Sequence, residues 1–102
     1  MARPLQHPDA DAIGLDGILH ALADPVRRSI VGKLIAQGEM NCGDTCDDLA
    51  PSTISHHHRI LRESGLIRSE KRGVAVVNSV RQAEIEARFP GLLAAILQPH
   101  QA

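Results

Sequence analysis

The apolar residues of this chain change their spacing at Gly65, and that change limits the fold more than any other feature. Before Gly65 they recur at helical spacing, first at Leu15, Ile18, Leu19 and Leu22. After it, LIRSE is expected to form a short strand, KRG supplies a turn with Gly73, and VAVVNSV is a second strand of β-branched residues. A helical pattern then returns toward the C-terminus. The sequence therefore predicts helices on both sides of one β-hairpin.

Capping and turn residues divide the first helical part. A helix is expected over 13–23, and Asp24-Pro25 starts a second one, because Asp24 can cap it and Pro25 fits its first turn. This second helix is expected to end near Gly38. Its predicted apolar face holds Val26, Ile30, Val31, Leu34 and Ile35, and its predicted polar face holds Arg27, Arg28 and Lys33.

The acidic stretch 39–48 predicts a short helix at most. Pro51 and Ser52 signal a further start, with Ser52 as the cap, and Gly65 ends that helix. The last helical stretch, from Arg81, is expected to break or kink at Phe89-Pro90-Gly91.

The predicted fold is therefore mainly α with a small β-hairpin. Its order is helix, helix, short helix, helix, hairpin and helix, which is the layout of a winged helix-turn-helix. We expect one such domain over 13–98, with a flexible N-terminal tail over 1–12 and a C-terminal tail over 99–102.

Composition excludes several classes of protein. With 102 residues, 43% hydrophobic and 23% charged, the chain suits one globular domain. A single Phe, without Trp or Tyr, argues against binding that needs stacked aromatics, and no apolar run could span a membrane. The N-terminal sequence MARPLQHPDADAIG lacks the apolar stretch of a secretory signal, and two cysteines are too few for a disulfide framework. A cytoplasmic location is expected.

Positive charge is concentrated between Ser52 and Gly73, which contains five basic and two acidic residues, although the net charge of the whole chain is only −1. Such a patch favours a polyanionic partner, while an ordinary solvated face or an acidic protein partner are the alternatives. On a helix beginning near Ser52, one arc opposite Ile54 and Leu61 can donate hydrogen bonds to DNA and carries no acid. It comprises Ser52, Ser55, His56, Arg59 and Arg62.

The segments LADPVRRSIVGKL, STISHHHRILRESGLI and KRGVAVVNSV, in this order, resemble the ArsR/SmtB family of bacterial repressors over about Leu19 to Val80. The resemblance implies a homodimer, joined by its first and last helices, that binds an inverted-repeat operator and is released by an inducer, often a metal ion. It also implies DNA-contacting positions on the recognition helix and on the wing. These are Ser52, Thr53, Ser55, His56 and Arg59, with Lys71 and Arg72 on the wing.

The run His56-His57-His58 invites a metal-site interpretation, but successive helical side chains point about 100° apart and cannot converge on one ion. His56 is expected to face outward, His58 to lie at the edge of the core, and His57 to lie between.

Cys42 and Cys46 are the remaining sensor candidates, because on a helix this spacing puts them on one face. They could bind a metal or metalloid, form a reversible disulfide or have no sensing role. Arsenic-sensing relatives carry Cys-x-Cys here, which this chain lacks, and the zinc ligands that other relatives place on the last helix are absent. No cofactor is certain. No motif indicates an enzyme.

Overall fold

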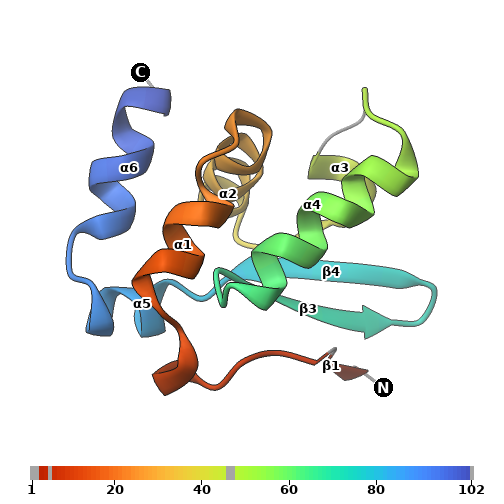
Figure 1. The fold of residues 1–102 in the computed structure, drawn as a ribbon. Helices are drawn as coiled ribbons and strands as arrows, with labels where there is room; N and C mark the ends of the chain where they lie inside the picture. Colours follow the sequence, from red (N-terminus) through yellow and green to blue (C-terminus); the bar gives the residue numbers. More distant parts are fainter. Residues whose placement is uncertain (1–2, 5, 46–47, 102) are drawn as a thin grey trace.

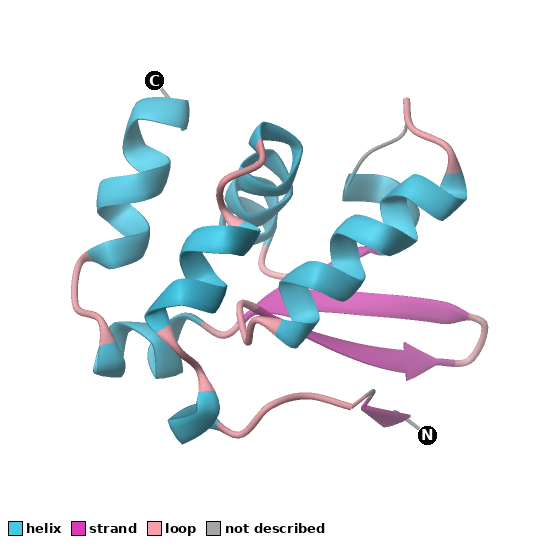
Figure 2. Ribbon diagram, viewed as in Figure 1, coloured by secondary structure: helices cyan, strands magenta, loops and turns pink. Residues whose placement is uncertain are grey.

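The computed structural model describes residues 3–4, 6–45 and 48–101 (Figure 1). Its helices are α1 (Leu15–Ala21), α2 (Pro25–Gln37), α3 (Cys42–Thr45), α4 (Pro51–Glu63), α5 (Gln82–Arg88) and α6 (Leu92–Gln101), and a 3-10 turn, η1, spans Ala10–Ala12. Its strands are β1 (Arg3–Pro4), β2 (Met40–Asn41), β3 (Ile67–Arg72) and β4 (Ala75–Val80). The mainly helical fold and the hairpin are as predicted (Figure 2).

The start of α2 follows the predicted chemistry. The Asp24 carboxylate accepts hydrogen bonds from the backbone N–H groups of Val26 (2.7 Å) and Arg27 (3.2 Å), and Pro25 occupies the first turn. Burial acts to raise the pKa of Asp24, but these two donors and the nearby Arg27 charge lower it overall. At the other end of α2, Gly38 adopts a φ of 90°, which favours glycine.

The hairpin pairs β3 with β4 from Ile67↔Val80 to Arg72↔Ala75, so Gly73 and Val74 form its two-residue turn. Gly73 has a φ of 64°, which suits the first central position of such a turn. Two strands that the sequence did not predict flank the hairpin in the order β1-β3-β4-β2, all antiparallel. Each has two residues, too short to show a period.

The N-terminal segment runs along the hairpin (Figure 1), and whether it is the flexible tail expected over 1–12 stays a prediction. β1 pairs with β3, and the backbone N–H of Ser69 donates to Nε2 of His7 at 2.9 Å. The Arg81 guanidinium donates to the Pro8 carbonyl at 2.8 Å. These contacts join residues more than 60 positions apart, so local sequence does not reveal them. The predicted domain boundaries at 13 and 98 stay a prediction.

One hydrophobic core joins the helices to the hairpin. Its fully buried members come from α1, α2, α4, β3, α5 and the loops between them: Ile13, Ile18, Ala21, Ile30, Val31, Leu34, Leu61, Leu66, Ile67 and Ile85. The C-terminal helical stretch breaks at Phe89-Pro90-Gly91 as predicted, which makes α5 and α6 separate helices. Among the described residues, no helix is both long and apolar enough to cross a membrane.

Candidate nucleic-acid interface

The helix α4 presents the predicted polar arc to solvent. Ile54 and Leu61 are buried on its inner side, whereas Arg62 is half-buried at the end of the arc. The other four members of the arc, which are Ser52, Ser55, His56 and Arg59, are exposed, and so is the neighbouring Thr53. With Arg62, the structure thus brings six hydrogen-bonding side chains onto the outer side of one helix.

The start of α4 corrects one expectation. Ser52 is not the cap: Pro51 is the first helical residue and Ala50 is the N-cap, with no side-chain hydrogen bond. Pro51 lacks an N–H and has the φ of a first-turn residue, so the cap lies two positions earlier than expected. Ser52 therefore lies inside the first turn, with its side chain exposed.

The three histidines occupy three different environments. His56 is exposed as predicted, and the rings of His56 and His57 lie 5.8 Å apart at an angle of 54°. His57, which was expected between the two sides, is only 9% exposed, and His58 is 2% exposed. In the part of the chain that the structure describes, no three His, Cys, Asp or Glu side chains gather as metal ligands would.

His58 joins α4 to α3. A carbonyl oxygen only accepts, so Nδ1 of His58 donates to the Ile54 carbonyl at 2.9 Å. In the neutral ring Nε2 is then the acceptor, and it lies 3.2 Å from Oγ1 of Thr45. Burial lowers the pKa of His58, because the charged ring would lose its hydration. The neutral His58 therefore holds α4 against the short helix α3.

Arg27 corrects the expectation of an exposed polar face on α2, because it is only 8% exposed. Its Nε donates to the Ala21 carbonyl at 2.6 Å and its Nη2 to the His20 carbonyl at 3.4 Å. These carbonyls lie at the C-terminal end of α1, where the helix dipole makes a cation favourable. Nη1 lies 3.3 Å from Nδ1 of His57 and can only donate to it. Arg27 thus links α1, α2 and α4.

The two other bases of α2 also hold neighbouring segments. Arg28 donates to the Leu22 carbonyl at 2.8 Å, and the Lys33 amine donates to the Thr45 carbonyl at 2.9 Å. The basic side chains of α2 therefore position the helices around α4, and their carbonyl partners could not be predicted from the local sequence.

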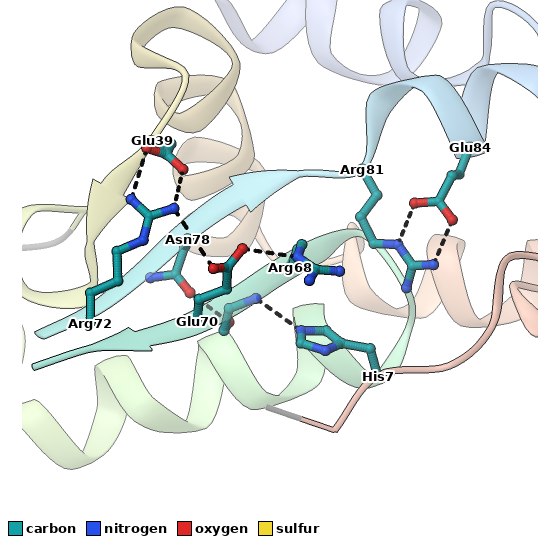
Figure 3. Close-up of polar contacts among 9 residues, drawn as sticks. His7, Glu39, Arg68, Glu70, Arg72, Asn78, Arg81 and Glu84 are labelled. Atoms are coloured by element: carbon teal, nitrogen blue, oxygen red, sulfur yellow. Dashed lines mark hydrogen bonds and ion pairs between the residues drawn. The ribbon is translucent and has the colours of Figure 1, made fainter. Parts of the chain in front are cut away.

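On the wing, the hairpin β3–β4, the two predicted contact residues differ. Lys71 is exposed. Arg72 instead donates from Nη2 and Nη1 to the two carboxylate oxygens of Glu39, at 3.0 and 3.2 Å (Figure 3). These hydrogen bonds raise the pKa of Arg72. Arg68 pairs with Glu70 at 3.0 Å. Part of the positive excess between Ser52 and Gly73 is therefore neutralised within the protein.

The cysteine hypothesis is not decided by this geometry. Cys42 begins α3, while Cys46 lies outside the described residues. The predicted shared face of the two thiols therefore stays a prediction.

Comparison with known proteins gives the family. The model of a helix-turn-helix domain matches residues 22–70, which include α2, α3, α4 and most of β3. An uncharacterized HTH-type transcriptional regulator of Bacillus subtilis (strain 168), YceK, is 32% identical over 79 residues, covering 74% of this chain and 79% of the relative. The crystal structure of an ArsR family transcriptional regulator superposes with a TM-score of 0.67 at 29% identity, covering 86% of this chain and 97% of that one.

The chain belongs to the ArsR family of helix-turn-helix transcriptional regulators. The transcriptional repressor SdpR of B. subtilis (strain 168) is also similar, at 27% identity over 74 residues, which cover 71% of this chain and 81% of the relative. The family resemblance seen in the sequence is thus confirmed. An ArsR-family protein is a DNA-binding regulator and not an enzyme, so DNA is a partner of this chain.

Proposed function

We propose that this regulator is a homodimeric repressor that binds an inverted-repeat operator and leaves it when an inducer binds. In this proposal α4 enters the major groove with Ser52, Thr53, Ser55, His56 and Arg59 toward the bases and neighbouring phosphates. Arg62 contacts the backbone at the end of the arc. The observation that supports this best is the exposed arc of α4, in which each side chain can donate a hydrogen bond.

On the wing, we assign the phosphate contact to Lys71. Its ammonium is exposed near the turn of the hairpin, whereas the Arg72 guanidinium is already paired with Glu39. Contacts of this kind to the DNA backbone set the orientation of the protein and the strength of binding, and contacts to base edges set the sequence preference.

The dimer is supported by an apolar surface that the single chain leaves exposed. Leu15 and Leu19 on α1 are 43% and 45% exposed. A groove of about 630 Å³ between α2, α5 and α6 is lined by the apolar Ile35, Ala83, Leu93, Ala94 and Leu97, with Gln82, Glu86 and Gln98 beside them. Two copies would also read two half-sites about one DNA turn apart. Analytical ultracentrifugation tests this: we expect twice the 11.0 kDa of one chain, and a single-chain mass in complex with operator would contradict it.

Fluorescence anisotropy with the DNA upstream of the chain's own gene, beside a scrambled duplex, tests the DNA contacts. Arg59→Ala should cost about 1–3 kcal/mol of binding to the preferred sequence and much less on scrambled DNA, because it removes a base contact. Lys71→Ala should weaken both duplexes alike and reduce the slope of log affinity against log salt by about one.

Arg88→Ala is the matched control, since it removes one exposed positive charge from α5, at the opposite end of the hairpin from its turn (Figure 1). It should leave both affinities close to the wild-type values. Equal affinity of the wild type, Arg59→Ala and Lys71→Ala for the promoter fragment would contradict the proposed contacts.

A further inference from the structure

A chain of ion pairs crosses one face of the hairpin and ends outside it, on Glu39. Arg68 pairs with Glu70, the other oxygen of Glu70 lies 3.8 Å from Nη2 of Arg72, and Arg72 pairs with both oxygens of Glu39. Figure 3 shows the Arg72 and Glu39 side chains pointing toward each other. We call the pair Glu39–Arg72 the clasp.

The clasp joins segments that the strand ladder does not join directly. Glu39 lies between Gly38, which ends α2, and β2. β2 pairs with β4 and not with β3, so Arg72 on β3 reaches past β4 to meet Glu39. One bidentate ion pair therefore ties the turn end of the hairpin to the end of α2, which itself packs against α4.

Strand alternation places the clasp on the side of the hairpin away from the DNA-contacting helix. Ile67 is buried in the core with Ile54 of α4, and Lys71 lies on the same face of β3 as Ile67. Arg72 lies on the opposite face. Lys71 thus shares a side with α4, whereas the Arg72 guanidinium is turned toward Glu39.

We propose that Glu39 is a positioning residue for DNA binding: through Arg72 it holds the wing at the orientation in which Lys71 meets the backbone. This inference rests on the proposed function. It makes a counterintuitive prediction, because removal of a carboxylate near DNA should ordinarily strengthen binding by reducing repulsion. If Glu39 acts through the clasp, its neutralisation weakens binding instead.

The test compares Glu39→Gln, Arg72→Gln and the double variant with the wild type on the promoter fragment over a range of salt. We expect each single variant to lose about two- to fivefold in affinity, the range of an exposed ion pair, with an unchanged salt slope because no phosphate contact is removed. The double variant should lose no more than either single one, since both break the same link.

Glu84→Gln is the matched control. It also removes one carboxylate from a bidentate pair with an arginine, Arg81, but on α5, beyond the far end of the hairpin. It should not weaken DNA binding. Tighter or unchanged binding by Glu39→Gln, or a salt slope reduced by about one in Arg72→Gln, would overturn the proposal and make Arg72 a direct phosphate contact.

A second readout on the free proteins separates this proposal from the proposed function. Amide hydrogen exchange near the hairpin turn, from Lys71 to Val76, should be about two- to fivefold faster in Glu39→Gln and Arg72→Gln and unchanged in Glu84→Gln. Unchanged exchange in all three would show that no clasp holds the wing. Faster exchange in a protein that binds every duplex alike would retain the clasp and overturn the proposed DNA contacts.

Discussion

His58→Leu would separate what a buried neutral histidine contributes from what an apolar side chain of similar size contributes. At pH 8 the variant loses the hydrogen bonds to the Ile54 carbonyl and to Thr45. Each such bond contributes about 0.5–1.5 kcal/mol, so the free energy of unfolding should fall by about 1–3 kcal/mol. Leucine fills most of the space of the ring, which limits any cavity.

The pH dependence gives the sharper result. Because burial lowers the pKa of His58 in the folded state, the unfolded chain binds a proton first as the pH falls below 6.5. The contribution of neutral His58 to the free energy of unfolding of the wild type is fully present above pH 6.5. Between pH 6.5 and the folded-state pKa this contribution falls by at most about 1.4 kcal/mol per pH unit. The variant lacks this loss, so its deficit at pH 8 should shrink as the pH falls toward 5.

Urea unfolding followed by far-ultraviolet circular dichroism between pH 8 and pH 5 measures this difference. The chain concentration must be fixed, because a dimer is stabilised by mass action. His56→Leu is the control for the exchange of histidine for leucine itself, because it makes the same substitution at an exposed position of α4. If the stability curve of His58→Leu stayed parallel to that of the wild type between pH 8 and pH 5, the neutral buried state of His58 would be wrong.

Two further substitutions test local features of the fold by urea unfolding. Asp24→Ala removes the cap of α2 and should lower the free energy of unfolding by about 0.5–2 kcal/mol at pH 7. Because the pKa of Asp24 is lowered in the folded state, this difference should disappear as the pH falls below the ordinary carboxylate range. A difference that persisted in acid would contradict the capping role. Gly65→Ala should lower the free energy of unfolding by more than about 1 kcal/mol, since Gly65 has a φ of 88° and an added Cβ would overlap the Ile13 side chain. Gly17→Ala lies inside α1 without such a clash, so it should raise the free energy of unfolding by about 0.5–1 kcal/mol.

The features that were predictable from sequence are those written in adjacent residues. Asp24-Pro25 starts α2 because the cap and the first turn need only those side chains and the next two N–H groups. The hairpin follows from two short stretches around Gly73, of which the second is rich in β-branched valines. The outward arc of α4 follows from helical spacing alone, and so does the divergence of the three histidines.

The contacts that place α4 and the wing depend on residues far apart in the chain. Arg27 lies 30 positions from His57, and Arg72 lies 33 positions from Glu39. An arginine on a predicted polar helix face gives no local sign that it will be buried on the carbonyl oxygens of a preceding helix. A charged pair on two separate elements gives no sign that it will meet.

Sequence alone therefore determined the order of the helices and the hairpin and the polar face that α4 exposes, because capping, turn geometry and periodicity act over a few neighbouring residues. Tertiary structure decided which basic side chains are used within the protein and which remain exposed. Packing turned Arg27 inward to the end of α1 and aligned Arg72 with Glu39, while Lys71 stayed exposed. Alternation on β3 gives neighbouring residues opposite faces, and only the packed sheet determines which face meets a carboxylate.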